Sequence, residues 1–97
     1  MKVVTVCGSM KSKEEMLKIA FELESKLGYC VLQCVYDNSN TKLTTNEINN
    51  LSECHFKKID LSDAIYVVNI NNYIGNATKN EIEYAKAKSK EIIYHCK

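Results

Sequence analysis

The stretch KVVTVCGSM, residues 2–10, decides the fold of this chain. Its first six residues are mostly β-branched and apolar, and the run stops at Gly8 and Ser9. This is the pattern of a buried parallel strand that ends in a tight turn. A helix is expected next, because Ser12 and Glu15 have the spacing of a capping box and apolar residues then recur at helical spacing. These recurring residues, which precede Gly28, are Met16, Ile19, Ala20, Leu23 and Leu27.

The rest of the chain repeats this alternation of short apolar strands and amphipathic helices. Thr45 is a candidate cap for the second helix, Asn50 marks a candidate break in it, and Thr78 is expected to open the last helix. The predicted strands are 2–7, 29–36, 64–70 and 91–95, the predicted helices are 12–27, about 45–62 and about 78–89, and the predicted loops are 37–45 and 71–77.

Strands that alternate with helices require right-handed crossovers, which produce a parallel sheet covered on both faces. The predicted fold is a single α/β domain over residues 1–97, a small three-layer sandwich of the flavodoxin-like or Rossmann-like type. Its four-stranded parallel sheet is expected in the order 2-1-3-4. In this order the winding direction changes between the first and third strands, so a ligand crevice opens at their carboxyl ends. Two glycine-bearing loops border the crevice, Gly8 to Lys13 and Asn71 to Thr78.

The charges of the chain are nearly balanced. Thirteen lysines, with no arginine, face 12 acidic residues and leave a net charge of +1. A protein that coats nucleic acid needs a basic stripe to displace counterions, so no nucleic acid polymer is expected as a partner. Without arginine, a bound phosphate must be held by backbone N–H groups, hydroxyls or lysines. No apolar run has the length of a membrane span or the form of a signal peptide, so no membrane partner is expected.

The five cysteines, Cys7, Cys30, Cys34, Cys54 and Cys96, include no C-x-x-C pair. We therefore expect no disulfide framework, no metal ion and no cofactor. Cys7, Cys30 and Cys34 lie in apolar runs, where packing is favoured over chemistry. A reducing cytoplasm fits this cysteine usage best. Because a chain of 97 residues has little margin for burying a core, a homodimer or higher homo-oligomer is expected.

Side chains at the predicted crevice carry the candidate chemistry. Gly8 would let the backbone approach an anion, although a glycine at this position is also common simply to make the turn. Glu81 lies three residues after Thr78, a spacing that fits a capping box as well as a carboxylate facing the crevice. Tyr73, in the loop, could stack on a ligand ring or pack over the sheet edge.

Two further residues also have a structural explanation beside a functional one. Asp63 precedes the third strand, where it is either a turn residue or a second carboxylate for the site. His55 lies on the second helix, and a lone helical histidine is more often a satisfied structural side chain than a catalyst. The sequence alone does not fix the distance of either residue from Glu81.

Three blocks of the sequence resemble the nucleoside 2-deoxyribosyltransferase-like family, which includes the 2′-deoxynucleoside 5′-phosphate N-hydrolases. The last block resembles the glycine, threonine, glutamate, tyrosine and alanine pattern of the family, at Gly75, Thr78, Glu81, Tyr84 and Ala85. The three blocks are VTVCGSM (4–10), HFKKIDLSDAIYVVN (55–69) and YIGNATKNEIEYAKAKSKEIIYH (73–95).

The resemblance implies cleavage or transfer at the N-glycosidic bond of a (deoxy)nucleoside or its 5′-monophosphate. It implies that Glu81 is the nucleophile, that Asp63 orients the base or Glu81, and that Tyr84 hydrogen-bonds the nucleophile. The assembly it implies is a homodimer with active sites near the interface. A non-catalytic nucleotide-binding module and, with less support, an NAD glycohydrolase are alternatives. The substrate-binding residues that the pattern and the crevice indicate are Cys7, Gly8, Ser9, Met10, Tyr73, Gly75 and Thr78.

Overall fold

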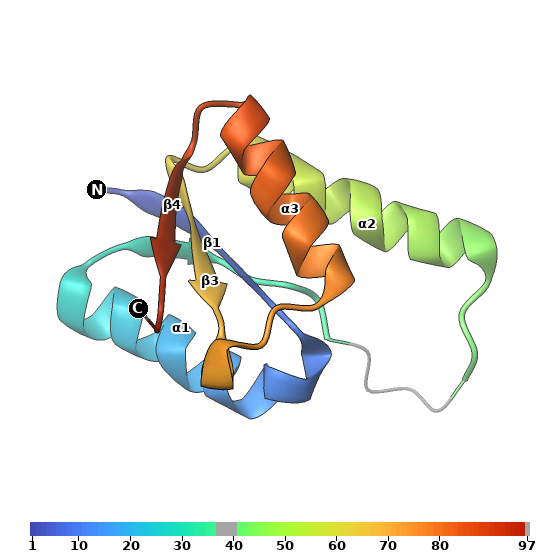
Figure 1. The fold of residues 1–97 in the computed structure, drawn as a ribbon, viewed down its shortest axis with the longest axis horizontal. Helices are drawn as coiled ribbons and strands as arrows, with labels where there is room; N and C mark the ends of the chain where they lie inside the picture. Colours follow the sequence, from blue (N-terminus) through green and yellow to red (C-terminus); the bar gives the residue numbers. More distant parts are fainter. Residues whose placement is uncertain (37–40, 97) are drawn as a thin grey trace.

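The computed structural model describes residues 1–36 and 41–96, and its centre is one four-stranded sheet (Figure 1). All neighbouring strands are parallel, and their order is β2-β1-β3-β4. This confirms the predicted α/β fold and the predicted strand order. The strands are β1 (Val3–Gly8), β2 (Cys30–Leu32), β3 (Ala64–Val68) and β4 (Glu91–Tyr94).

Helices cover both faces of the sheet and complete a three-layer sandwich. In Figure 1, α1 lies on one face, and α2 and α3 lie together on the other. Among the described residues, no helix has the length and apolar character needed to cross a bilayer. The helices are α1 (Lys13–Leu27), α2 (Thr45–Asp60) and α3 (Asn76–Ala87), and the short 3₁₀ helices are η1 (Met10–Ser12) and η2 (Ile70–Asn72).

Side chains that alternate along the strands build a separate core on each face of the sheet. Val4 and Val6 of β1 pack with Met16 and other apolar residues of α1. Cys7, which points the other way, packs with Ile59 of α2 and with residues of α3. Because β1 and β3 are buried on both faces, they are apolar almost throughout, as expected of central parallel strands.

The helix starts differ from the sequence-based expectations. Ser12 precedes α1 but makes no side-chain cap hydrogen bond, whereas the Ser9 side chain accepts from the Lys11 N–H and caps η1. The cap of α2 is Thr44, one residue before the predicted Thr45, and it forms a capping box with Glu47. In each case the turn that leads into the helix decides which hydroxyl reaches an unpaired N–H group.

Strand β2 is shorter than the predicted strand 29–36. Only residues 30–32 pair with β1, because β2 is an edge strand and the chain beyond it leaves the sheet. Helix α2 is continuous, so the suggested break near Asn50 is absent. Of the predicted loop 37–45, residues 37–40 lie outside the described part of the chain.

The amino-terminal half of α2 extends beyond the sheet. Residues 45–54 are all exposed, and burial begins at His55. Figure 1 shows this half of the helix projecting away from the other layers. Its apolar residues Ile48 and Leu51 therefore face the space beside the carboxyl end of β1 rather than the core.

Candidate functional site

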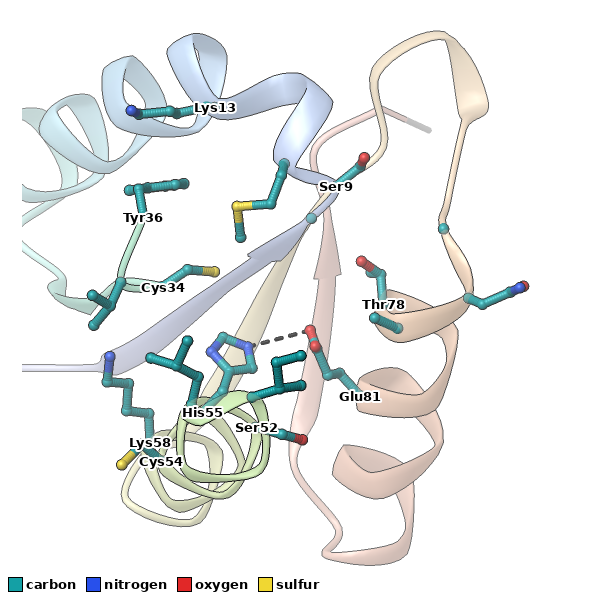
Figure 2. A pocket seen from close by; sticks show the side chains of 18 residues that line it. Ser9, Lys13, Cys34, Tyr36, Ser52, Cys54, His55, Lys58, Thr78 and Glu81 are labelled. Carbon is teal, nitrogen blue, oxygen red and sulfur yellow. Dashed lines mark ion pairs between the residues drawn. The ribbon is translucent and has the colours of Figure 1, made fainter. Parts of the chain in front are cut away.

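A pocket of about 650 Å³ opens at the carboxyl end of β1 (Figure 2). Its walls come from the turn after β1, the chain that follows β2, the helix α2 and the amino end of α3. Pockets for small ligands have volumes of roughly 300–1,000 Å³, so a nucleoside-sized molecule fits this space. The pocket lies where the strand order predicted a crevice.

The pocket lining combines apolar side chains with two lysines. Lys58 Nζ donates a hydrogen bond to the Gln33 carbonyl oxygen at 2.6 Å. Lys13 Nζ lies 5.5 Å from the centre of the Tyr36 ring. They bring two amines into a lining that also carries polar side chains and the carboxylate of Glu81. The apolar contributors include Met10, Val35, Ile48 and Leu51.

The hydroxyl of Tyr36 is buried and has no hydrogen-bond partner among the described residues. Burial raises the pKa of Tyr36 to about 12, so this phenol remains protonated at neutral pH. A buried hydroxyl without a partner is uncommon and costs stability.

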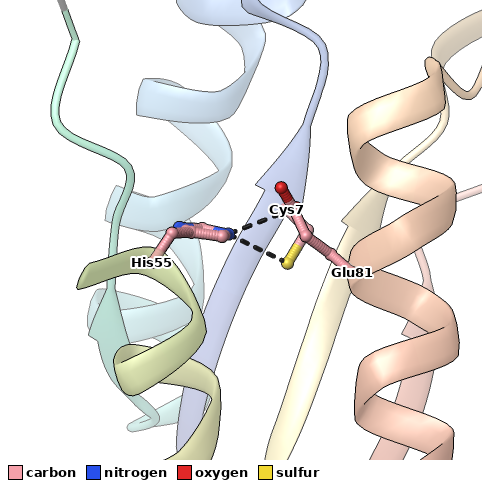
Figure 3. Close-up of side chains that lie close together, drawn as sticks. All are labelled: Cys7, His55 and Glu81. Atoms are coloured by element: carbon pink, nitrogen blue, oxygen red, sulfur yellow. Dashed lines mark hydrogen bonds and ion pairs between the residues drawn. The ribbon is translucent and has the colours of Figure 1, made fainter. Parts of the chain in front are cut away.

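Three reactive side chains from three different elements meet at the pocket (Figure 3). His55 of α2 and Glu81 of α3 line it, and their ion pair joins Nε2 to Oε1 at 3.2 Å. The same Nε2 lies 3.5 Å from Sγ of Cys7, which belongs to β1. Cys7 is fully buried, whereas the side chains of His55 and Glu81 are 12% and 16% exposed.

Helix periodicity explains why His55 and Glu81 reach the same place. His55 lies one turn before Ile59, which is fully buried, so it occupies the border of the buried face of α2. Glu81 precedes Ile82, which is buried against the sheet, and therefore lies at the edge of the apolar stripe of α3. Both side chains consequently reach the gap between the helices and the end of β1.

The electrostatics of this cluster favour a neutral thiol beside an ion pair. Burial raises the pKa of Cys7 to about 12, so its thiol is protonated at pH 7. Burial lowers the pKa of His55, but hydrogen bonds to Cys34, Cys7 and Glu81 raise it more, to a net value of about 12. Of these three hydrogen-bond partners Glu81 is the carboxylate, and its Oε1 lies 3.2 Å from Nε2 of His55.

Glu81 is not a helix cap. Helix α3 begins at Asn76 with Gly75 as its N-cap residue, and no side chain caps it. Thr78 is therefore inside the first turn, where it is buried, and the Thr78–Glu81 capping box that the spacing suggested does not form. Glu81 lies in the second turn, with its carboxylate directed toward His55 (Figure 2).

Most of the predicted site residues gather at this pocket. Cys7 contacts His55 directly beneath the lining. At Gly8 a side chain would meet Met16, because an added Cβ would lie 2.9 Å from its sulfur. This close packing is a structural reason for the glycine. The predicted residues that line the pocket are Gly8, Ser9, Met10, Gly75, Thr78 and Glu81.

Three predicted residues lie elsewhere. Asp63 precedes β3 at the opposite end of the sheet, where its carboxylate accepts the Val3 N–H at 2.8 Å. The Tyr84 hydroxyl donates to Asp60 at 2.7 Å instead of to Glu81. Tyr73 is half-exposed, lies outside the pocket lining and stacks under the Lys11 amine. The expected contacts of Asp63 and Tyr84 with Glu81 are therefore not formed.

His55 is the residue whose importance the sequence understated. Its sequence context gave no distance to Glu81, 26 residues away along the chain. The available signal was its position at helical spacing before Ile59, which indicates the edge of a buried face. Cys34 and Tyr36 were assigned to a strand that in fact ends at Leu32, so their place in the pocket wall was not foreseen.

No family model and no curated protein matches this chain.

Proposed function

We propose that the chain cleaves the N-glycosidic bond of a (deoxy)nucleoside or its 5′-monophosphate, with Glu81 as the nucleophile. The observation that carries this proposal is the placement of Glu81, which faces the pocket, pairs with His55 and has no role in capping its helix. A glutamate carboxylate is ionised at neutral pH, as a nucleophile must be.

The reaction would proceed through a covalent intermediate. The Glu81 carboxylate attacks the anomeric carbon, and the C–N bond breaks as its electron pair passes to the nucleobase. The departing base takes a proton from water or from an acid on the opposite side of the sugar. Water, or a second nucleobase, then attacks the glycosyl ester and releases the free carboxylate. Water as acceptor gives hydrolysis and a second base gives transfer.

His55 would act as a positioning residue in this reaction. It contacts the nucleophile itself at 3.2 Å, so it stands on the attacking side of the sugar and not beside the leaving base. The ion pair holds the carboxylate in one orientation, and the buried Cys7 thiol contacts the same nitrogen of the imidazole. A carboxylate held in place loses less freedom on reaching the transition state.

The pocket offers distinct environments for the two ends of a nucleotide. The apolar side chains Val35, Ile48 and Leu51 suit a flat nucleobase. The amine of Lys13, four residues after Ser9, suits a phosphate, which this arginine-free chain cannot hold with a guanidinium group. The phosphate or sugar end would lie by Gly8 and Ser9, as the family resemblance implies.

Glu81→Gln tests the nucleophile. Base release from the four deoxynucleosides, their 5′-monophosphates and NAD is followed by chromatography. The amide keeps the size of the side chain but cannot form the ester, so turnover should fall by more than about a thousandfold in a folded protein. Glu83→Gln is the matched control, since Glu83 lies on the same helix, is exposed and, among the described residues, forms its ion pair with Lys86. It should retain wild-type turnover.

The outcomes separate the candidate functions. Retention of more than about a tenth of the wild-type rate by Glu81→Gln, a loss of only ~1.4 kcal/mol, would show that Glu81 is not the nucleophile. Release of nicotinamide from NAD alone would indicate a glycohydrolase for that substrate. Nucleotide binding with no turnover of any compound would indicate a binding module.

The proposed assembly is a homodimer, with its interface on the outer face of α1. Leu17 and Phe21 lie one turn apart on this helix and are 43% and 72% exposed. Large apolar side chains that adjoin one another on a surface favour association. A second copy would cover them without covering the pocket-lining residues of α2 and α3. This proposed interface therefore differs from the one beside the active site that the family resemblance implies.

A further inference from the structure

The cluster of Cys7, His55 and Glu81 combines three kinds of metal-binding atom. A thiol sulfur, an imidazole nitrogen and a carboxylate oxygen all lie within 4.8 Å of one another. The three residues come from β1, α2 and α3, so the fold assembles them although no short sequence motif contains them. Such residues, with mixed sulfur, nitrogen and oxygen donors, are the usual protein ligands of zinc.

Two of the three separations among these atoms match the edges of a zinc tetrahedron, and the third, from Glu81 to Cys7, is at most 4.8 Å. With bonds of about 2.0 Å to nitrogen and oxygen and about 2.3 Å to sulfur, tetrahedral ligands stand about 3.3 Å apart for nitrogen and oxygen and about 3.6 Å for nitrogen and sulfur. The corresponding separations here are 3.2 Å from His55 to Glu81 and 3.5 Å from His55 to Cys7. An ion can therefore be held with only small side-chain movements.

We propose that Cys7, His55 and Glu81 form a binding site for a divalent zinc-class metal ion, with its fourth coordination position open to the pocket. Cys7 would be the innermost ligand, because it is fully buried, and His55 and Glu81 would hold the ion from the pocket side. Three protein ligands with one open position are typical of zinc sites that bind an exchangeable water or ligand. A thiolate ligand favours zinc over magnesium or calcium.

Coordination of one carboxylate oxygen would make Glu81 a weaker nucleophile, so the metal-free form would be the one that attacks a sugar. Coordination releases the thiol and imidazolium protons to solvent and changes no oxidation state. The proposed metal site does not depend on the proposed glycosidic activity. Metal binding is measured without substrate, and base release is measured in the presence of a chelator, so the failure of either proposal is recognised separately.

The test uses the full-length chain, reduced and freed of metal with a chelator that is then removed. Zn²⁺ is titrated in competition with a chromophoric chelator, and Co²⁺ is titrated separately while absorption is recorded. We expect one equivalent of either ion per chain. We also expect the thiolate-to-cobalt charge-transfer absorption and the visible bands of a four-coordinate Co²⁺ ion.

Four variants locate the ion. Cys7→Ser should abolish the charge-transfer absorption, and His55→Gln and Glu81→Gln should each weaken Zn²⁺ binding. The loss of a direct ligand should exceed the roughly 10–100-fold cost of losing a second-shell partner. Cys54→Ser is the matched control, because Cys54 is exposed and belongs to the same pocket lining but is not one of the three grouped residues. Its affinity and spectrum should equal those of the wild type.

Several results would overturn the proposal. One is the absence of metal binding at a tenfold excess of metal over micromolar protein. Another is a thiolate-to-cobalt absorption that persists in Cys7→Ser, and a third is a Zn²⁺ affinity that changes in Cys54→Ser. If Cys7→Ser fails to fold, as judged by its circular dichroism, His55→Gln and Glu81→Gln decide the matter. Unchanged Zn²⁺ affinity in both of these folded variants would exclude the site.

Discussion

At the scale of single residues, the His55–Glu81 ion pair links the site to pH. The folded pKa of His55 is raised to about 12 from an ordinary value near 6.5. Because this pKa is higher in the folded state than in the unfolded state, the protonated His55 contributes its full stabilisation of the fold below pH 6.5. This contribution to the free energy of unfolding is lost as the pH rises toward the folded pKa, because the unfolded state has then released the proton that the folded state still holds.

Removal of the imidazole should therefore change how stability depends on pH. Between about pH 6 and about pH 8.5, the free energy of unfolding of the wild type should fall relative to that of His55→Gln. Urea denaturation at several pH values measures the difference. Glu81→Gln should also flatten the dependence, whereas the exposed Glu83→Gln should keep it. Parallel curves for wild type and His55→Gln would contradict the assigned protonation.

At the scale of helices and strands, the start of α2 can be tested at one residue. The Thr44 hydroxyl accepts the Glu47 N–H at 3.1 Å, and the Glu47 carboxylate accepts the Thr44 N–H at 2.8 Å. Thr44→Ala removes this cap and should lower the free energy of unfolding by about 1 kcal/mol. Thr45→Ala, in the first turn of the same helix, should change it little. Urea denaturation of both variants decides which threonine is the cap.

The sequence predicted which segments form helices and strands more reliably than it predicted the residues at which they begin and end. The runs around Val4 and Ile65 are apolar and β-branched because central parallel strands are buried on both faces, so their identity follows from local composition. The capping residue, by contrast, depends on how the preceding loop enters the helix. Ser12 and Thr78 had the right chemistry and spacing but not the required backbone approach.

Part of the candidate site could likewise be predicted from the sequence. Gly8 and Glu81 follow strands at the switch point of the sheet, a place that strand order alone defines. His55 reaches Glu81 only because α2 has a particular rotation and lies beside α3, and neither property is encoded by residues near position 55. Asp63 is at the amino end of β3, although its proximity to that strand in sequence suggested a place in the site.

At the scale of the whole molecule, the exposed face of α1 predicts association. Sedimentation at micromolar concentration should give twice the mass of the 11.1 kDa chain. Phe21→Lys places a charge in the proposed interface and should shift the mass to that of one chain while leaving the fold intact. A wild-type mass near 11.1 kDa would show that this face is not a dimer interface.

The projection of α2 beyond the sheet has a thermodynamic consequence for any ligand. Residues 45–54 form part of the pocket wall but pack against no core, so their helical state depends largely on the capping box and on whatever occupies the pocket. A ligand that contacts Ile48 and Leu51 would bury apolar surface and order the helix at the same time. Its binding heat capacity would then be more negative than the contact surface alone implies, and its affinity would be lower by the conformational entropy lost in this ordering.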